Sequence, residues 1–354
     1  MIRYPMKSLA SALILAACAL VAHGASPMAP ALSRFSEESI PKVAPTERPV
    51  QRSWAAPTSA PAGLPGRGLA EHPMLFAGEG YNVLHLVNEG RVVWTYQSGP
   101  GGEIDDVWLL TNGNVLYTKQ TFVEELSPAK QVLWHYDAPQ GTEIHSAQPL
   151  GLDKVLIVQN GRPAKAIIFH VPSGRIEYEH DIPVAATTSV HGQFRRIRQT
   201  AAGTFLLPYL SEGKVVEYDR EFRQLWSYPI PFPWAAARLA NGNTLIVAEH
   251  DGLVREVNSA GQTVWEISRT ELPPELHAGN FQTAERLANG NTVLFTSVGG
   301  TKPDQRPTMT QCIEVTPAKQ VVWVLQDWKN LGPSTTAQFL DQPGVPEAPG
   351  ALQK

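Results

Sequence analysis

The 354-residue sequence contains only two cysteines, Cys18 and Cys312. Cys18 lies in an N-terminal targeting region, and Cys312 lies in an expected strand. If Cys18 is removed or lipidated, Cys312 has no partner within the chain, so a disulfide framework is excluded. We therefore expect Cys312 to be a buried, unreactive thiol.

The sequence also lacks an excess of either charge, because 29 Lys and Arg residues face 33 Asp and Glu residues, a formal net charge of −4. This balance excludes bulk electrostatic binding to nucleic acid or to an anionic membrane surface. Signatures of a phosphate-binding glycine loop, a nucleophile elbow or a Cys-x-x-Cys site are missing as well. The 28 glycines and 30 prolines are typical of a turn-rich, all-β chain.

Long hydrophobic runs are scarce, and the one from Leu9 to Ala22 follows two basic residues. It is too short for a membrane span and has the order of a secretory signal. Leu15 to Cys18 resembles a bacterial lipobox, which would end the signal peptide at residue 17 and make Cys18 the lipidated residue. Cleavage at the small residues that follow would instead remove residues 1–25. Both routes stay open, and both predict export to the periplasm, to the outer membrane or out of the cell.

Two segments, residues 26–72 and 342–354, are rich in proline and alanine and show no apolar period. Neither segment can bury enough apolar surface to offset the conformational entropy lost on ordering. We predict a disordered tether over residues 26–72, a globular domain over residues 73–341 and a disordered tail over residues 342–354.

Three signatures each recur six times between residues 73 and 341. The first is a strand with Trp at one register in five copies and Ile176 in the third copy. The second is an alternating apolar–polar strand just before it, typical of a half-buried strand. The third is a strand and turn, near-identical in three copies, where Asn-Gly favours a two-residue hairpin turn. These copies are Leu110–Asn114, Leu239–Asn243 and Leu287–Asn291.

A repeat of about forty residues predicts four strands per blade, so six repeats predict an all-β, six-bladed β-propeller. Five or seven blades stay open, because the fourth copy is weak. The last turn-bearing strand, Thr335–Leu340, has no blade of its own, whereas the first repeat begins near Pro73 without such a strand. Pairing the two would close the ring and protect its edges.

The inner strands of a propeller surround a central channel, and alternation along them decides which side chains face it. One register is wholly apolar and is predicted to pack into the blades: Val107, Ala147, Ile197, Ala236, Ala284 and Ala337. The two flanking registers are mostly polar and are predicted to supply ligand-binding residues to the channel: Asp106, Trp108, Gln148, Arg196, Arg198, Glu285 and Gln338.

The two channel arginines admit two interpretations. Guanidinium pairs bind carboxylate, sulfate or phosphate through bidentate hydrogen bonds, which predicts a small anionic ligand. Alternatively, Arg198 pairs with Glu285 and Arg196 with Asp106, in a salt-bridge network that holds the blades together. Both interpretations stay open.

Three histidines precede inner strands near one channel mouth: His145, His191 and His277. Such imidazoles could bind zinc, or one could act as a base or nucleophile. Their spacing matches no metal motif, and blade order does not place the three side by side, so hydrogen-bonded loop histidines are the other interpretation. The acids nearby either hold a cation or form a solvated rim: Glu103, Asp105 and Asp106.

The phrase Leu-Ala-Asn-Gly-Asn-Thr at residues 239–244 and 287–292, followed by a strand and then Val-Val-Trp or Thr-Val-Trp, resembles two groups of propeller repeats. These are the six-bladed bacterial arylsulfotransferase-like family and the quinoprotein (PQQ-type) propellers, which usually have eight blades. The resemblance covers about residues 73–341. It implies a channel histidine as transient sulfate acceptor, often in a His-Asp pair before the Asn-Gly turn. The matching inner-strand positions here hold no such pair, so no catalytic residue is carried over.

We therefore expect an exported, monomeric and non-catalytic propeller that binds a small anionic molecule or an envelope protein through its channel face. No cofactor is expected, although PQQ and a divalent metal stay open. One alternative is a divergent transferase or lyase that uses a mouth histidine with Arg198 as oxyanion partner. Another is a scaffold for envelope assembly, and the fold alone does not separate these functions.

Overall fold

The computed structural model describes residues 26–35, 69, 71–79, 81–99, 102–299, 301–302 and 304–354. The signal peptide, Cys18 and most of the 26–72 tether lie outside the described residues, so export and lipidation stay predictions. No helix in the described part is long and apolar enough to cross a membrane.

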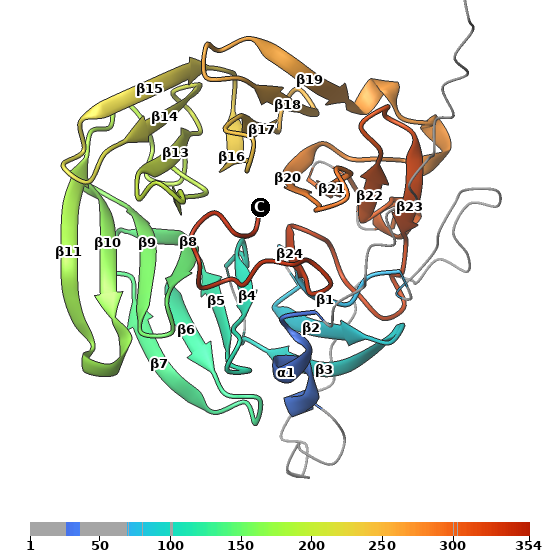
Figure 1. Ribbon diagram of the computed structural model, residues 1–354, viewed down its shortest axis with the longest axis horizontal. Coiled ribbons are helices and arrows are strands. Elements are labelled where there is room, and N and C mark those ends of the chain that lie inside the picture. Colours follow the sequence, from blue (N-terminus) through green and yellow to red (C-terminus); the bar gives the residue numbers. More distant parts are fainter. Residues whose placement is uncertain are drawn as a thin grey trace, which may run out of the picture.

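Six four-stranded antiparallel sheets stand in a ring around a central axis, as Figure 1 shows. This arrangement confirms the predicted six-bladed β-propeller. We number the blades in chain order and give the strands of each blade from the channel outward.

The first three blades span the N-terminal half of the propeller. Blade one contains β24 (Thr336–Phe339), β1 (Met74–Ala77), β2 (Val83–Asn88) and β3 (Arg91–Gln97). Blade two contains β4 (Val107–Leu109), β5 (Val115–Lys119), β6 (Phe122–Leu126) and β7 (Val132–Asp137). Blade three contains β8 (Glu143–Leu150), β9 (Lys154–Asn160), β10 (Ala164–His170) and β11 (Arg175–Ile182).

The remaining blades complete the ring. Blade four contains β12 (Arg198–Gln199), β13 (Phe205–Tyr209), β14 (Lys214–Tyr218) and β15 (Gln224–Pro229). Blade five contains β16 (Pro233–Arg238), β17 (Thr244–Ala248), β18 (Leu253–Val257) and β19 (Thr263–Ser268). Blade six contains β20 (Phe281–Arg286), β21 (Thr292–Thr296), β22 (Cys312–Val315) and β23 (Val321–Leu325). Short 3-10 turns are η2 (Val171–Ser173), η3 (Arg269–Glu271), η4 (Pro274–Leu276) and η5 (Arg306–Thr308).

The ring closes as predicted, because β24 from the end of the domain pairs antiparallel with β1 from its beginning. His72 adds a second link across this closure. Its Nδ1 lies 2.8 Å from Asp341 Oδ2, and its Nε2 lies 3.0 Å from Glu314 Oε2. Burial alone would lower the pKa of His72, but the hydrogen bonds to these two carboxylates raise it to about 9. A protonated His72 therefore ties blade six to the chain segment that follows β24.

The near-identical turns close through a three-residue loop, which corrects the two-residue hairpin turn predicted from the sequence. In blade two, Leu110 N donates to Asn114 O at 2.8 Å, and Gly113 N donates to Leu110 O at 2.9 Å. Within this loop only Gly113 has a positive φ, of 88°, the left-handed position that a three-residue loop requires. Asn114 then donates through its side-chain amide to Glu125 on β6, at 2.6 Å. The equivalent pairs in blades five and six are Asn243 with Glu256 and Asn291 with Glu314.

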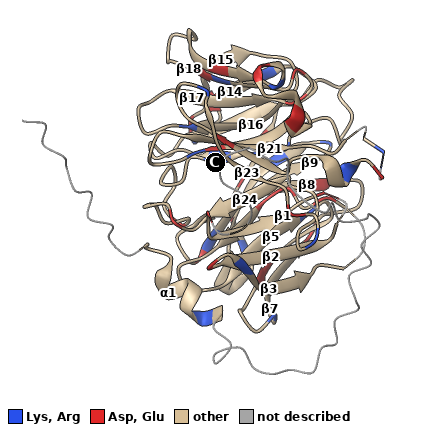
Figure 2. Ribbon diagram, turned by 90° about the vertical axis from the view of Figure 1, so that its right-hand side faces the viewer, with Lys and Arg blue, Asp and Glu red and all other residues tan. Residues whose placement is uncertain are grey.

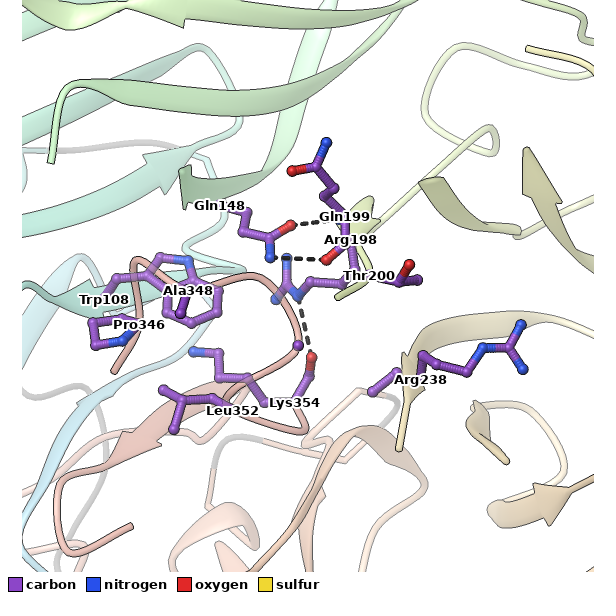
Figure 3. Close-up of a pocket in the computed structure, with 12 residues that line it drawn as sticks. Trp108, Gln148, Arg198, Gln199, Thr200, Arg238, Pro346, Ala348, Leu352 and Lys354 are labelled. Atoms are coloured by element: carbon purple, nitrogen blue, oxygen red, sulfur yellow. Dashed lines mark hydrogen bonds between the residues drawn. The ribbon is translucent and has the colours of Figure 1, made fainter. Parts of the chain in front are cut away.

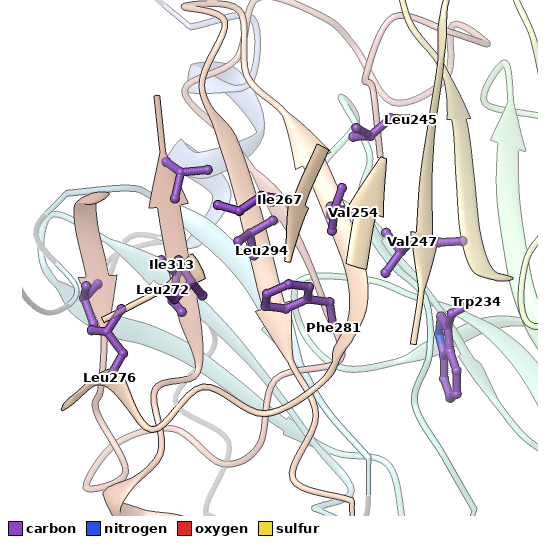
Figure 4. Close-up of a cluster of buried hydrophobic side chains, with 14 of the residues drawn as sticks. Trp234, Leu245, Val247, Val254, Ile267, Leu272, Leu276, Phe281, Leu294 and Ile313 are labelled. Atoms are coloured by element: carbon purple, nitrogen blue, oxygen red, sulfur yellow. The ribbon is translucent and has the colours of Figure 1, made fainter. Parts of the chain in front are cut away.

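The core consists of separate apolar clusters rather than one continuous mass. The six residues of the predicted apolar register are all buried, and each belongs to a different cluster, which confirms that prediction. Figure 4 shows one cluster, in which Val247 and Val254 of blade five lie beside Phe281 of blade six. Burying each such side chain stabilises the fold by roughly 1.5–3 kcal/mol. Cys312 is also fully buried in a cluster, and burial raises its thiol pKa.

The recurring outer-strand tryptophans link neighbouring blades. Trp94 of β3 donates through Nε1 to Pro128 O in blade two, at 2.9 Å. Trp265 of β19 makes the same bond to Pro317 O in blade six, also at 2.9 Å. These residues therefore fix the angle between blades as well as filling the space between them.

The start of the predicted tether is ordered, which corrects the expectation for residues 26–35. This segment forms α1 (Ala29–Leu32) and the 3-10 turn η1 (Ser33–Phe35), at the edge of the first blade in Figure 1. Met28 and Phe35 are almost fully buried, and the Phe35 ring meets the Trp94 ring edge-on at 5.6 Å. Three apolar side chains, those of Met28, Ala31 and Phe35, are enough to dock this short segment, although their number is too small to give an apolar period in the sequence.

Basic and acidic residues are interspersed over the side of the propeller drawn in Figure 2. This distribution agrees with the small formal net charge of −4. The overall charge therefore does not single out a binding surface, whereas buried charged residues do meet in the channel, around Asp106.

Candidate functional site

The central channel has two different ends. At one end the chain enters the inner strands, through residues 103–106, 143–145 and 191–195. We call this end the acidic mouth. At the opposite end the inner strands leave through turns such as Leu110–Asn114 and Leu239–Asn243. We call that end the turn mouth.

Asp106 lies in the centre of the channel and binds both predicted arginines. Its carboxylate accepts hydrogen bonds from Arg198 Nη1 at 2.8 Å and Nη2 at 3.0 Å, and from Arg196 Nη1 at 3.1 Å. Burial alone would raise the pKa of Asp106, but the neighbouring cations hold it below its usual range. Arg196 pairs with Asp106, as the salt-bridge interpretation expects. The expected pairing of Arg198 with Glu285 is wrong, because Arg198 makes bidentate hydrogen bonds to Asp106 instead.

These contacts leave little for an anionic ligand in the channel centre. Arg196 also donates to Asp105 O at 2.9 Å and to Thr336 Oγ1 at 3.1 Å. Burial lowers the pKa of Arg196 to about 10, which still leaves it charged at neutral pH. An anion that bound here would first have to displace the Asp106 carboxylate from both guanidiniums.

The two channel glutamines join neighbouring blades. Gln148 Oε1 accepts from Gln199 N at 2.6 Å, and its Nε2 donates to Gln199 O at 3.3 Å. Gln338 makes the same pair of bonds to Leu109 N and O, at 2.7 and 3.2 Å. Each amide therefore satisfies the free backbone edge of the next inner strand, and this structural role accounts for both of its polar atoms.

Trp108 and Glu285 face the channel as predicted from their register. Trp108 Nε1 donates to Ala147 O at 2.5 Å, and the Arg198 guanidinium lies 5.0 Å from the Trp108 ring. Glu285 is fully buried, and burial raises its pKa to about 7. Its Oε2 has no hydrogen-bond partner among the residues that the structure describes.

The tail over residues 342–354 is ordered across the turn mouth, which corrects the disordered tail expected from the sequence (Figure 1). Three of its side-chain oxygens accept hydrogen bonds from equivalent backbone N–H groups in three of the near-identical turns. These bonds are Thr111 N to Glu347 Oε1 at 2.6 Å, Ala240 N to Gln353 Oε1 at 3.0 Å and Ala288 N to Gln342 Oε1 at 2.8 Å. The repeated turns thus present a repeated donor that holds the tail, and Leu352 of the tail also packs against the apolar cluster that contains Trp108 and Leu110.

The tail ends inside the channel, where Lys354 lies beside Trp108 and Arg198 in the pocket of Figure 3. Lys354 Nζ donates to Val107 O at 2.8 Å and to Ala337 O at 3.0 Å. It lies 3.7 Å from Asp106 Oδ1 and 4.1 Å from the centre of the Trp108 ring. The turn mouth is therefore filled by the protein itself.

The acidic mouth brings three carboxylates together. Glu79, Glu103 and Asp105 each offer an oxygen, and these oxygens lie within 4.8 Å of one another. Asp105 is 1 % exposed, and its Oδ1 has no hydrogen-bond partner in the described part of the chain. Burial and the neighbouring carboxylates raise the pKa of Glu79 well above its usual range. A group of like charges with a buried, unsatisfied oxygen is the arrangement that a bound cation would stabilise.

The fold fixes these carboxylates in place. Gly78 sits so close to Pro333 that a Cβ would lie 1.9 Å from Pro333 O, so the chain before Glu79 packs directly on the loop before β24. The backbone at Glu79 is held in place as well, because Glu79 N donates a hydrogen bond to Thr335 Oγ1 at 3.0 Å. Gln282 Nε2 donates to Glu79 Oε1 at 2.8 Å and orients the carboxylate.

Two of the three predicted histidines lie at this mouth and contact each other, with ring centres 5.5 Å apart. His145 is buried; its Nδ1 lies 2.6 Å from Asp105 Oδ2 and its Nε2 lies 3.0 Å from Glu143 Oε2. Burial alone would lower its pKa, but the surrounding carboxylates raise it to about 10. His191 is about half exposed and shares Glu143, at 2.9 Å from Nδ1.

His277 lies away from this pair, at the end of η4 with a left-handed φ of 47°. It lines a surface groove with Arg269 and Asn280. The structure thus places His145 and His191 together and separates His277 from them.

Three residues of the channel ends escaped the sequence analysis: Glu79, Glu143 and Lys354. Glu79 follows β1 rather than an inner strand, and second strands end at the same mouth where inner strands begin. Aligning the second strands of the blades on their pairing with the inner strands places Glu79 at the same position as Gln120 and Glu249. No sequence signal marked Lys354, because its position depends on where the tail folds back.

Comparison with known protein families matched none, and comparison with curated proteins matched none. Solved structures share the propeller fold. A protein of unknown function from Bacteroides caccae has a TM-score of 0.66 at 21 % identity, covering 75 % of this chain and 98 % of that chain. A streptogramin B lyase has a TM-score of 0.52 at 13 % identity, covering 78 % of this chain and 87 % of its own. Virginiamycin B lyase from Staphylococcus aureus, solved with quinupristin, has a TM-score of 0.52 at 8 % identity, covering 77 % and 94 %. At these identities the likeness is one of fold, and the arylsulfotransferase-like resemblance stays a prediction.

Proposed function

We propose that this protein is a ligand-binding propeller that holds a hard divalent cation, of the calcium class, at its acidic mouth. Glu79, Glu103 and Asp105 would supply the protein ligands. The observation that carries the proposal is the buried Asp105 Oδ1, which has no hydrogen-bond partner among the described residues yet stands beside two further carboxylates. Leaving such an oxygen unsatisfied costs about 1–3 kcal/mol, which a bound cation would recover.

The donor set favours a hard cation over zinc. Carboxylate oxygens suit calcium, magnesium and manganese, whereas zinc prefers imidazole and thiolate. The three oxygens all lie within 4.8 Å of one another, which is close enough for a single ion to contact all of them. Glu103, His145 and His191 also converge. Both ring nitrogens of His145 already face carboxylates, so this second group has fewer free ligand atoms.

The anionic ligand expected from the sequence fits this site better than the channel arginines. Calcium takes six to eight oxygen ligands, so three protein carboxylates leave positions for an outside ligand. A molecule with carboxylate or phosphate oxygens would fill those positions, next to the half-exposed His191. The channel arginines, in contrast, are already bound to Asp106.

Isothermal titration of the chelator-treated protein with calcium, magnesium, manganese and zinc chlorides tests the proposal. We expect calcium to bind with one equivalent and more tightly than zinc. Asp105→Asn and Glu79→Gln should each weaken calcium binding at least tenfold. Glu249→Gln, an acid of the same mouth outside the carboxylate group, is the matched control and should change the affinity less than threefold. Absence of calcium binding, or equal binding by all four proteins, would overturn the proposal.

The calcium-loaded protein can then be screened against organic carboxylates and phosphates by thermal shift. A ligand at a hundred times its dissociation constant stabilises by roughly 2.7 kcal/mol, a readily measured change in melting temperature. Ligands that act only when calcium is present would support the proposed role. Conversion of a ligand during the screen would favour the enzymatic alternative, with His191 as the exposed base at this mouth.

A further inference from the structure

The turn-mouth end of the channel has a set of polar groups of its own. The inner strands are the inner edges of the six sheets, so their backbone carbonyls on the channel side have no strand to pair with. At the apolar register, four of these carbonyls accept hydrogen bonds from channel side chains. Trp108 donates to Ala147 O, Arg198 donates to Ile197 O, and Lys354 donates to Val107 O and Ala337 O. The channel therefore presents a ring of acceptors that needs N–H donors.

Lys354 satisfies two of these acceptors with a single amine. The two bonds measure 2.8 and 3.0 Å, and they come from neighbouring blades, one from β4 and one from β24. The Trp108 ring covers the amine at 4.1 Å, and Asp106 Oδ1 lies at 3.7 Å. Two carbonyls, an aromatic face and a carboxylate together form a cradle for a primary amine.

The cradle belongs to the propeller, whereas the amine is delivered by a tail that lies outside the blades. The tail is held at the turn mouth by side-chain oxygens on turn N–H groups, such as Gln353 on Ala240, and by backbone bonds, such as Arg286 N to Gln353 O at 3.0 Å. The side-chain contacts of Gln353 and Gln342 are polar and exposed, so this part of the tail can be exchanged at lower cost than a strand. A cavity of about 20 Å³, room for one water, remains between the tail and the channel wall.

We infer that the turn-mouth end of the channel is a binding site for an unbranched primary amine, and that Lys354 occupies this site in cis. A ligand of that class supplied from outside would take the place of the Lys354 side chain. This inference does not depend on the cation proposed for the acidic mouth, since none of the three carboxylates there contributes to the cradle.

Chemical rescue of Lys354→Ala in the full chain tests the inference. The substitution removes a propylamine-sized part of the side chain, so n-propylamine should refill the cradle. We expect the variant to melt below the wild-type protein, and n-propylamine to raise its melting temperature by about 3 °C or more in a saturable manner. The wild-type protein and Lys329→Ala, an exposed lysine replaced in the same way, should show no such shift.

Two matched compounds isolate the chemistry. tert-Butylamine has the same charge but a branched shape, and 1-propanol has the same shape without the amine. Rescue by n-propylamine alone would support the site. Equal shifts with either compound, or an equal shift in the wild-type protein, would overturn it. If Lys354→Ala unfolds on purification, the refolding yield with each compound replaces the melting temperature as the readout.

The pH dependence provides a further check. The charged groups that face the amine are Asp106, Glu285, Arg196 and Arg198. Burial, together with the two arginines, lowers the pKa of Lys354 to about 7 despite the two acids. An added amine has a free pKa of about 10.5, so it loses a proton on binding between these values. Rescue at a fixed total amine concentration should therefore strengthen from pH 7 to pH 9, and a rescue that weakens over this range would contradict the inference.

Discussion

The two mouths of the channel are built from the same repeated strands, yet different polar groups meet at each. At the turn mouth each exposed donor of three equivalent turns has a tail oxygen as its acceptor. At the acidic mouth three carboxylates gather and Asp105 Oδ1 has no hydrogen-bond partner among the described residues. Glu347 Oε2 at the turn mouth also has no hydrogen-bond partner among the described residues, so the distinguishing feature of the acidic mouth is the gathering of three carboxylates, which a bound cation would stabilise. In this comparison, the turn mouth is the end whose N–H groups hold the tail, and the acidic mouth is the end at which we propose a cation.

The largest expected effect lies between the two mouths, at Asp106. Asp106→Asn leaves Arg196 and Arg198 buried without their carboxylate, and we expect a loss of about 3–5 kcal/mol in the free energy of unfolding. Urea denaturation of the wild-type and variant proteins measures it. Asp251→Asn, at an exposed turn, should change stability by less than about 0.5 kcal/mol. A similar small loss for Asp106→Asn would show that the buried ion pairs do not hold the blades.

The next effect tests the structural role of the turn mouth. Glu347 accepts from both Thr111 N and Thr111 Oγ1, at 2.6 and 2.9 Å, so Glu347→Ala should cost about 2–3 kcal/mol. Denaturation again provides the measurement, with the exposed Glu275→Ala as control. If Glu347→Ala were neutral, the tail would be a loose appendage, and the contrast between the mouths would fail.

His72, which bonds to Asp341 just after β24, makes a pH-dependent contribution to the free energy of unfolding. Its pKa of about 9 in the folded protein exceeds the unfolded value of 6.5, so its contribution is complete below pH 6.5 and is lost as pH rises through 9. We expect the stability difference between wild type and His72→Gln to shrink by about 1–2 kcal/mol between pH 6 and pH 10. If the difference stayed constant, His72 would stabilise the fold only through the packing of its imidazole against Trp323 and Phe339.

The smallest expected effect concerns the acidic mouth. Glu79→Gln removes a carboxyl group that is crowded by two others, so in the presence of a chelator the free energy of unfolding should change by less than about 1 kcal/mol, and in the stabilising direction. The variant should nevertheless lose the stabilisation that calcium gives the wild-type protein. Thermal melts with chelator and with calcium separate the two effects. A marked destabilisation in chelator would show that Glu79 stabilises the fold and is not kept for binding a cation.

The sequence predicted the architecture well because the propeller is a repeat. The Trp-bearing strand and the turn-bearing strand each occur six times, which predicted six blades. Alternation along the inner strands identified the six buried residues of the apolar register, which include Val107 and Ala337. The displaced copy at Thr335–Leu340 even predicted the closure between β24 and β1. Local pattern suffices for such features, because each blade repeats the same short-range pairing.

The site residues were predicted less well, because their partners are distant in sequence. The strand register correctly predicted that Arg198, Trp108 and Gln338 face the channel, but the roles of these side chains depend on neighbours from other blades. Arg198 reaches Asp106, 92 positions away, and Gln338 bonds to Leu109, 229 positions away. No periodicity in either strand carries that information.

The sequence by itself therefore predicted six blades, with five or seven left open, together with the order of their strands, the closure of the ring and the side of each inner strand that faces the channel. Only the tertiary structure decided which charges pair across the channel, that residues 342–354 fold back to fill the turn mouth, and that Glu79 joins Glu103 and Asp105. The physical reason is range: hydrophobic alternation and turn conformation act over a few residues, whereas the electrostatics of a buried channel depends on every blade at once.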